Sequence, residues 1–263
     1  MVIYYFSGTG NCYFVAKTIA KEIDDARIVA IGRAYINGEF KTEDESIGFV
    51  YPSYGYGLPK IVRQFVKKLE AKNAKYVFGV VTYGTRPGSV HGGLKRLLKK
   101  KGIKLNYAKN IKSVENFVPM FKMVNEEKAK EILKGNEEKA KEIAKDVKNQ
   151  VHNKFRTRYI LAPIFNILFN GIATRVLPKL FVVRGCNECG LCKNVCPMSN
   201  IDIVKRKPKF RKRCNVCTAC MQVCPIKAIR LLRATKKARR YFNPEVSLTE
   251  FVGTDITQNL SDK

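Results

Sequence analysis

Eight of the nine cysteines of this 263-residue chain lie in two short stretches with the same spacing. Residues 186–197 read CNECGLCKNVCP and residues 214–225 read CNVCTACMQVCP, so each has Cys at i, i+3, i+6 and i+10, followed by Pro. The chain begins with MVIYYFSGTG, which lacks the basic start and cleavage site of a secretory signal, so we expect a cytoplasmic location. Because thiols stay reduced in the cytoplasm, the cysteines indicate metal binding and not disulfides.

This spacing is the bacterial pattern for 4Fe–4S clusters, in which the fourth cysteine of each run serves the other cluster. It predicts one cluster on Cys186, Cys189, Cys192 and Cys224, and a second on Cys214, Cys217, Cys220 and Cys196. Zinc is the alternative, but a zinc site takes four ligands from paired CxxC motifs, and this does not account for a tandem run with the present spacing. Residues 201–210 are predicted as a hairpin between the halves. The segment 184–233 resembles the small α+β, bacterial-type two-4Fe–4S ferredoxin domain.

The first 118 residues alternate short apolar runs with helical patterns. We expect strands at 2–6, 26–31, 47–52, 75–84 and 104–114, and helices from about Asn11 to Glu22 and over 59–71 and 92–102. Five strands with crossover helices imply a parallel sheet that is covered on both faces. Between the second and third strands, Asn37-Gly38 predicts a small hairpin, and residues 32–46 leave no room for a helix there.

An internal repeat follows this region, because NEEKAKEI occurs at 125–132 and again at 136–143. Glutamate and lysine dominate both copies, which predicts a solvated surface helix without chemistry. Gly135 is expected to break this helix, with Asn136 as the cap of a second one.

Three glycine-rich loops follow predicted strands at the sheet edge where α/β proteins bind ligands. In SGTGNC (7–12), small residues between a strand and a helix let backbone N–H groups close around an anion. It is neither a Walker loop, since no Lys-Ser/Thr ends it, nor a dinucleotide fingerprint, since Tyr13 holds the third glycine position. The loops 51–59 and 82–88 carry tyrosines, which suit a flat aromatic ligand; core packing is the alternative for each tyrosine.

With these loops, residues 1–150 resemble a flavodoxin, and SGTGN resembles the FMN phosphate loop of that family. The resemblance implies an α/β, doubly wound parallel five-stranded sheet, a phosphate held by loop 7–12, and an isoalloxazine ring framed by loops 52–57 and 82–85. The chain departs from the family at Cys12, where Thr or Ser is usual, and it has no tryptophan to stack on the flavin. The implied FMN-binding residues are Ser7, Gly8, Thr9, Gly10, Asn11, Cys12, Pro52, Ser53, Tyr54, Gly55, Tyr56, Gly57, Thr82, Tyr83, Gly84 and Thr85.

The formal net charge of +28 is distributed unevenly. Residues 184–233 hold 12 Lys/Arg against 2 Asp/Glu, and residues 153–183 hold 5 against none. The apolar stretch 159–183 is interrupted too often by proline, asparagine and basic residues for the roughly 20-residue run of a membrane span. We expect buried connecting structure here; the alternative is a shallow helix on a membrane surface, with weak contact.

The whole chain resembles the flavodoxin–ferredoxin fusion proteins of anaerobes, including its tail RRYFNP at 239–244. The expected organisation is a flavodoxin-like FMN domain (1–150), an apolar helical connector (151–183), a ferredoxin domain (184–233) and a tail (234–263). The resemblance implies electron transfer between FMN and two 4Fe–4S clusters, coupling two-electron to one-electron redox partners. Acidic redox proteins, such as a ferredoxin or an oxidoreductase subunit, are the partners that the basic surface favours.

Two other functions are compatible with the same residues. One is a flavin- and iron–sulfur-dependent oxidoreductase with an unknown substrate; His91 is the only histidine near the loops and is interpreted as a helix-start or surface residue, while Arg86 could stabilise reduced flavin. The other is nucleic-acid binding through the basic runs 205–213 and 236–240. It is disfavoured because the aromatic residues gather at the predicted flavin loops and not among the basic runs.

Overall fold

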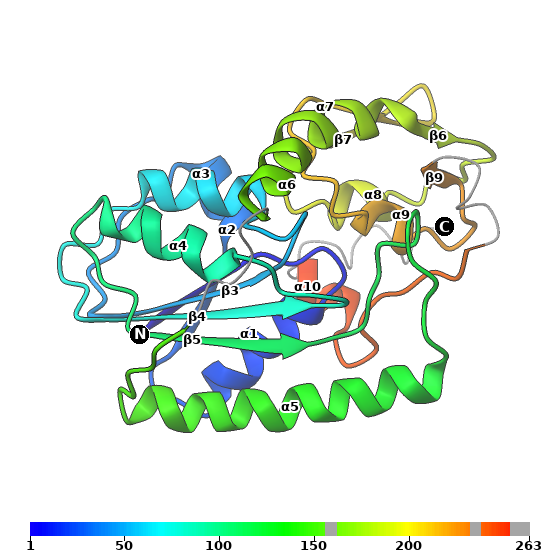
Figure 1. Cartoon of the computed structure of the whole chain (residues 1–263). Coiled ribbons are helices and arrows are strands. Elements are labelled where there is room, and N and C mark those ends of the chain that lie inside the picture. The colour runs from blue at the N-terminus through cyan, green and yellow to red at the C-terminus, as the bar shows by residue number, and fades with distance from the viewer. Residues whose placement is uncertain (156–161, 232–237, 253–263) are drawn as a thin grey trace.

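The computed structural model describes residues 1–155, 162–231 and 238–252 (Figure 1). At its centre lies a five-stranded sheet of order β2-β1-β3-β4-β5, in which every neighbouring pair is parallel. This is the doubly wound order of flavodoxin-like folds, so the predicted fold class is confirmed for this part of the chain. The strands are β1 (Val2–Tyr5), β2 (Arg27–Ala30), β3 (Ser46–Pro52), β4 (Tyr76–Tyr83) and β5 (Tyr107–Lys112).

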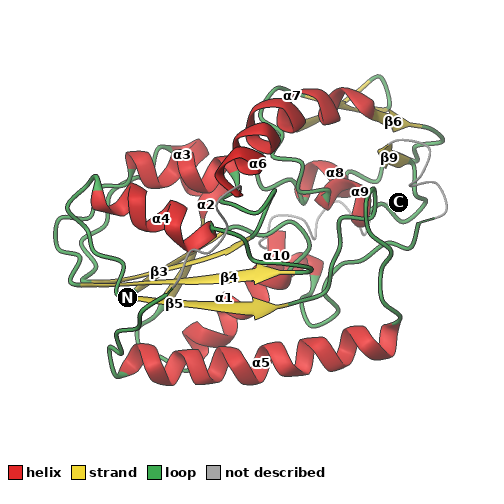
Figure 2. Ribbon diagram, in the orientation of Figure 1, coloured by secondary structure: helices red, strands yellow, loops and turns green. Residues whose placement is uncertain are grey.

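Helices cover both faces of this sheet, which is why its central strands are apolar along their length (Figure 2). On one face, Phe65 and Leu94 are buried against the strands; on the other, Val15 and Ala144 are. Full burial of a valine, leucine or phenylalanine side chain of this kind contributes about 1.5–3 kcal/mol. The first face carries α2 (Ile31–Asn37), α3 (Lys60–Lys68) and α4 (Val90–Lys99), and the second carries α1 (Asn11–Lys21) and α5 (Glu126–Lys148).

The hairpin that was predicted around Asn37-Gly38 is wrong. Residues 31–37 form the short helix α2, so the expectation that 32–46 leave no room for a helix is also wrong. Gly38, with φ 79°, is the C-terminal cap of α2, and its N–H bonds to the Ala34 carbonyl. An Asn-Gly pair supplies the left-handed conformation that ends a helix as readily as the one that a hairpin turn needs.

The expected break at Gly135 is wrong as well, because α5 runs unbroken through the repeat. Its N-cap is Asn125, whose side chain accepts a 2.9 Å hydrogen bond from the Lys128 amide. Asn136 is buried, with its amide 2.8 Å from the Ser113 hydroxyl. A mid-helix glycine costs about 1 kcal/mol, which burial of the apolar face of α5 against the sheet offsets.

The cysteine-rich segment forms two small antiparallel pairs. Strand β6 (Phe181–Val183) pairs with β9 (Ile229–Leu231), and β7 (Ile201–Val204) pairs with β8 (Lys207–Phe210), so the predicted hairpin at 201–210 is confirmed. The short helices α8 (Leu191–Asn194) and α9 (Ala219–Gln222) follow the cysteine loops.

The sequence repeat of this segment is also a backbone repeat. Left-handed residues recur 28 positions apart, at Glu188 and Val216, at Gly190 and Thr218, and at Ser199 and Lys227. The β-branched Val216 and Thr218 adopt this conformation at a cost of about 1–3 kcal/mol each. The surrounding structure must therefore impose the loop geometry of the second cysteine run.

Residues 162–180 form one helical run, which lies along the edge of the molecule away from the large sheet (Figure 1). It comprises α6 (Ala162–Leu168), η1 (Phe169–Ala173), α7 (Thr174–Val176) and η2 (Leu177–Leu180). The predicted burial of this connector is wrong: Ile167 is 63% exposed and Ile172 is 58% exposed. Within the described residues, no helix is long and apolar enough to cross a membrane.

The described part of the tail packs on the start of the chain. Its helix α10 (Leu248–Val252) brings Glu250 to the Tyr13 hydroxyl, which donates a 2.8 Å hydrogen bond. The Phe251 ring meets that of Tyr13 edge-on at 5.6 Å. The described part of the tail is thus joined to the start of the chain at helix α1.

His91 stands in the first turn of α4, as expected for a helix-start residue, but it is buried and not at the surface. Its Nε2 lies 2.9 Å from Asn110 Oδ1 and 3.2 Å from the Lys109 carbonyl oxygen. Burial lowers the pKa of His91 from 6.5 to about 4, so the imidazole is neutral in the folded chain at neutral pH.

This burial predicts a specific loss of stability in acid. Between pH 6.5 and about 4, the unfolded chain binds a proton at His91 that the folded chain does not. The free energy of unfolding should therefore fall by about 1.4 kcal/mol per pH unit in this window from His91 alone. Urea unfolding at about pH 7 and pH 5 should show a smaller fall for His91→Gln than for the wild type. The matched control, His152→Gln at an exposed site, should keep the wild-type fall; equal falls in both variants would contradict the assignment.

Candidate functional site

The three predicted flavin loops meet at one edge of the large sheet. They follow the adjacent strands β1, β3 and β4, whose carboxyl ends lie side by side. The Cys12 Sγ atom lies 3.0 Å from Thr82 Oγ1, and the Ser53 amide donates a 3.0 Å hydrogen bond to the Thr82 carbonyl. The structure thus brings loops 7–12, 52–57 and 82–85 together at the position where such sheets bind ligands.

Loop 7–12 ends at the start of α1 with Gly10, at φ 89°, and no side chain caps the first turn of that helix. Uncapped N–H groups at a helix start attract an anion. The loop side chains are held by protein groups: Ser7 Oγ accepts from the Gly10 amide at 3.1 Å, and Thr9 Oγ1 accepts from Asn116 Nδ2 at 2.5 Å. Asn11 Oδ1 accepts from the Tyr241 hydroxyl at 2.6 Å. These side chains fix the shape of the loop around the helix start.

The tail supplies site residues that the sequence did not reveal beyond its resemblance at 239–244. The Asn243 amide donates a 2.9 Å hydrogen bond to the Thr9 carbonyl, and its Cβ lies 2.9 Å from the point where a side chain on Gly10 would begin. Asn243 is 0% exposed, yet its Nδ2 has no hydrogen-bond partner among the described residues. A buried donor without a partner costs about 1–3 kcal/mol, and an acceptor within reach of this side chain would offset that cost.

The tyrosines of the second and third loops differ in their availability. The Tyr54 ring lies 6.1 Å from Phe6 and 6.1 Å from Phe169 between centroids, so it is engaged in packing. Tyr56 is 40% exposed and meets Phe165 edge-on, and Tyr83 is half-buried at the end of β4. Tyr56 and Tyr83 are therefore more accessible to a flat ligand than Tyr54.

A carboxylate that was not predicted lies beside the third loop. Glu115 follows β5, and its Oε2 accepts a 3.3 Å hydrogen bond from the Thr85 hydroxyl. It also fills the space that a side chain on Gly84 would need. Arg86 is exposed on the same loop. Glu115 lies on the loop after β5, and only the order of the strands in the sheet shows that this loop lies beside loop 82–85.

The second cysteine run lies directly on the first loop. A side chain on Gly8 would begin 2.6 Å from the Cys217 carbonyl oxygen and 3.0 Å from its Cβ, so only glycine permits this approach. Nearby, Asn215 Oδ1 accepts a 2.9 Å hydrogen bond from the Ile61 amide at the start of α3. The loop that the flavodoxin resemblance assigns to a phosphate and the run that the cysteine spacing assigns to a cluster are in contact.

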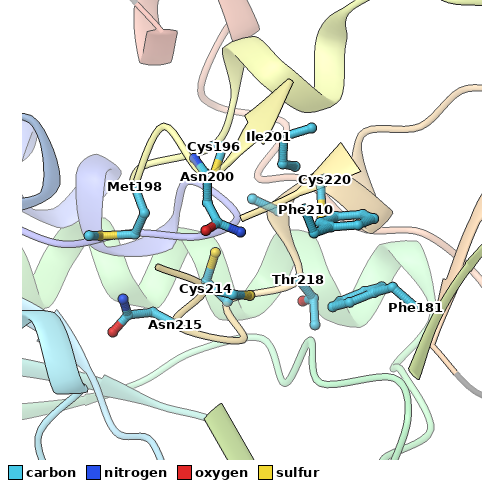
Figure 3. A pocket seen from close by; sticks show the side chains of 12 residues that line it. Phe181, Cys196, Met198, Asn200, Ile201, Phe210, Cys214, Asn215, Thr218 and Cys220 are labelled. Atoms are coloured by element: carbon cyan, nitrogen blue, oxygen red, sulfur yellow. The ribbon is translucent and has the colours of Figure 1, made fainter. Parts of the chain in front are cut away.

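Four cysteines from both runs line one cavity of about 20 Å³, together with Phe181 and Phe210. Figure 3 shows Cys196, Cys214 and Cys220 around it; Cys217 is the fourth. Burial raises the pKa of the Cys214 thiol to about 11. Burial also raises the pKa of the Cys220 thiol, and charge on Cys217, Cys214 and Cys196 adds to that rise.

The other four cysteines form a matching group. Burial raises the pKa of Cys192 to about 12, and charge on Cys189, Cys186 and Cys224 adds to this rise. Each group therefore combines three cysteines of one run with the fourth of the other. Cys192 also contributes weakly to the shift at Cys220, so the two groups are neighbours. The ninth thiol, Cys12, is buried in the flavodoxin-like part, where burial raises its pKa to about 12.

Backbone amides point at the sulfur atoms in a pattern that repeats between the runs. The first cysteine of each run accepts from the amide two residues on, at 3.4 Å for Cys186 and 3.3 Å for Cys214. The fourth accepts from the amide four residues on, at 3.3 Å for Cys196 and 3.2 Å for Cys224. Such N–H···S bonds stabilise negative charge on sulfur, as thiolate ligands require.

As placed, these thiols do not form a site for a single ion. Across the described ranges, no group of three or more His, Cys, Asp or Glu side chains could hold a metal ion. Zinc would need four sulfur atoms at about 2.3 Å from one centre. Burial raises the pKa of these thiols, so any cation that they bound would have to drive their ionisation.

No protein-family model matches the chain, and no curated protein matches its sequence. Among solved structures, the chain is similar to rubredoxin oxygen:oxidoreductase from the anaerobe Desulfovibrio gigas, with 18% identity and a TM-score of 0.37 over 57% of this chain and 36% of that chain. It is also similar to the Trp repressor binding protein of Bacillus subtilis (12% identity, TM-score 0.39, 56% of this chain and 98% of that chain). A third similar structure is the two-electron reduced flavodoxin of Megasphaera elsdenii (18% identity, TM-score 0.32, 42% and 85%).

The chain thus spans 36% of the length of the first of these proteins. The flavodoxin-like fold of residues 1–148 follows from the strand order itself.

Proposed function

We propose that this protein transfers electrons between FMN, bound at loops 7–12, 52–57 and 82–85, and two 4Fe–4S clusters bound by the eight cysteines of the two runs. The observation that carries the proposal is the contact of Cys217 with Gly8, because it sets a predicted cluster ligand against the predicted flavin loop. When bound, FMN exchanges one or two electrons and each cluster exchanges one, so together they can couple two-electron to one-electron redox partners.

The residues present fit a flavin phosphate. The uncapped start of α1 offers N–H groups to an anion, and Asn243 adds a buried donor whose Nδ2 has no partner in the described part of the chain. The sheet order supports the same place, because the site lies after β1 and β3, where the strand order reverses. We infer that Tyr56 and Tyr83 contact the ring and that Tyr54 holds the second loop in place.

The cysteine geometry favours clusters over zinc. A cluster spreads its four cysteine ligands around a body of several iron and sulfide atoms, so the thiols need not converge on one ion. The crossed grouping of the thiols supports one cluster on Cys186, Cys189, Cys192 and Cys224, and one on Cys214, Cys217, Cys220 and Cys196. The four N–H···S bonds would stabilise the bound thiolates.

A carrier is favoured over an enzyme with its own small-molecule substrate. His91, the histidine nearest the loops in sequence, is buried against β5 and neutral, so it does not serve as an acid or base at the flavin loops.

The basic surface indicates the chemistry of the proposed partner. Glu188 and Asp202, the two acidic residues of 184–233, are paired with Arg206 and Arg211, while the remaining exposed lysines favour an acidic redox protein.

The cofactor content is the first test. Protein purified without oxygen should contain about one FMN and about eight iron and eight acid-labile sulfide atoms per chain. Metal analysis, sulfide assay and flavin extraction measure these numbers. Bound zinc in place of iron would contradict the cluster assignment, and FAD or no flavin in reconstituted protein would contradict the FMN site.

The crossed ligation predicts non-additive losses of iron. Cys196→Ala and Cys217→Ala affect one proposed cluster, so combining them should remove about four iron atoms, as either change alone does. Combining Cys196→Ala with Cys189→Ala should remove about eight, because two clusters are lost. Cys12→Ser is the matched control and should retain all the iron. If the pair Cys196→Ala and Cys217→Ala loses twice the iron of the single variants, the crossing is wrong.

The role of Asn243 predicts a selective loss of FMN affinity. Asn243→Asp keeps the side-chain oxygen that accepts from the Glu245 amide, but it replaces the Nδ2 donor with negative charge. A lost hydrogen bond to a charged group costs about 1.5–3 kcal/mol, so FMN should bind at least about tenfold more weakly. Flavin fluorescence titration of the apoprotein measures this change, and thermal unfolding without FMN reports any loss of fold.

Thr249→Ala changes an exposed residue of the same tail and should bind FMN as the wild type does. Equal affinity in Asn243→Asp and Thr249→Ala would remove Asn243 from the phosphate site.

A further inference from the structure

The helical run 162–180 turns its uncharged polar side chains towards the protein. Asn166 is 4% exposed and Thr174 is 6% exposed. Asn166 Nδ2 donates to the Tyr54 carbonyl at 2.9 Å, and Asn170 Nδ2 donates to the Leu58 carbonyl at 3.0 Å. Residues four apart share a helix face, so 166, 170 and 174 form the inner side of the run.

The outer side of the run is apolar. Eight of the fourteen exposed large hydrophobic residues in the described part of the chain lie within 164–182, so the exposure is concentrated and not scattered. Five of them recur every four residues on the face opposite Asn166. This apolar strip consists of Ile164, Phe165, Ile167, Leu168, Ile172, Val176, Leu180 and Val182.

Such an arrangement is the reverse of a surface helix in water, which buries its apolar face. A contiguous exposed apolar patch marks a surface that meets another apolar phase or partner. Figure 1 shows α6 and α7 at the upper edge of the molecule, on the side away from α5. The strip is therefore presented outward by polar contacts that anchor the opposite face.

The charged residues near the apolar strip indicate what kind of surface the strip contacts. Residues 153–183 carry five Lys/Arg and no Asp/Glu, so every charged side chain of this stretch of the sequence is basic. Arg175 and Lys179 are exposed within the run, and Arg184 is exposed directly after β6. Basic side chains beside an exposed apolar helix face are typical of helices that lie in the interface of an anionic membrane.

We propose that the apolar strip lies in the interfacial region of an anionic lipid bilayer, with Arg175, Lys179 and Arg184 at the level of the headgroups. The 19-residue run would lie flat, over about 28 Å, since its basic residues and its polar inner face prevent it from spanning the bilayer. Membrane contact here is independent of the proposed redox function, because none of the strip residues is a predicted cofactor ligand.

Vesicle co-sedimentation of the cofactor-loaded full chain tests the proposal. We expect binding to vesicles of phosphatidylcholine mixed with phosphatidylglycerol, and much weaker binding to phosphatidylcholine alone. The combined change Ile164→Gln, Ile167→Gln and Ile172→Gln should weaken binding at least about tenfold, because apolar contact supplies much of the affinity. Iron content, circular dichroism and thermal unfolding should match the wild type, since these side chains already face water.

A matched control changes three exposed apolar residues outside the strip: Met120→Gln, Val204→Gln and Ile226→Gln. This variant should bind mixed vesicles as the wild type does. The combined change Arg175→Gln, Lys179→Gln and Arg184→Gln should lower affinity for the anionic vesicles only, and most strongly at low salt.

Two outcomes would overturn the proposal. One is that the strip variant and the control variant bind the anionic vesicles equally. The other is that the wild type does not bind anionic vesicles. If the wild type then forms a dimer that the strip variant loses in analytical ultracentrifugation, the apolar strip is an interface between two copies of this chain.

Discussion

The close approach of Cys217 to Gly8 is the contact on which the arrangement of this protein depends. It exists because glycine has no side chain, so the backbone of the second cysteine run can rest on the loop between β1 and α1. A second glycine of the flavodoxin-like part, Gly32, meets the Pro197 carbonyl of the first run in the same way. Both contacts set the cysteine runs against the carboxyl edge of the sheet. For the proposed electron transfer, the closeness of the cysteine runs to this edge of the sheet matters more than any single side chain.

The tail and the connector secure this arrangement from two sides. The tail reaches loop 7–12 through Tyr241 and Asn243, and it bonds back to the cysteine segment through Gln222, which accepts from the Tyr241 amide at 3.0 Å. The connector holds loop 52–57 through Asn166 and Phe169. The proposed flavin site is therefore not a property of the flavodoxin-like part alone, because segments from three regions of the sequence close around it.

Burial and hydrogen bonding act in opposite directions at the cysteines. Burial raises the pKa of the thiols, which disfavours the thiolate form, while the repeated N–H···S bonds favour negative charge on the same sulfur atoms. If the proposed clusters bind here, the metal would drive ionisation of the buried thiols, and loading would be coupled to folding of the segment. The left-handed Val216 and Thr218 belong to a loop whose geometry is imposed by the segments packed around it.

The sequence alone determined the parallel sheet and the hairpin at 201–210. Buried strands appear in the sequence as apolar runs. The spacing of apolar residues also differs between strands and helices, so a short segment is enough to tell them apart. It also predicted which loops meet, because loops after adjacent parallel strands share an edge. The sequence prediction failed where a local pattern is compatible with two structures. Asn37-Gly38 ends a helix and does not form a hairpin turn, and Gly135 lies within a helix and does not break it.

Only the tertiary structure decided the contacts between distant segments. It brought Asn243 and Glu115 to the loops and turned the apolar side of residues 162–180 outward. The composition of that stretch predicted burial, since apolar residues usually lie inside. Asn166 and Asn170 instead donate hydrogen bonds to the backbone carbonyls of Tyr54 and Leu58, and these bonds hold the polar face of the run inward. Which face of a helix is buried depends on the partner that it meets, and the partner lies more than a hundred residues away.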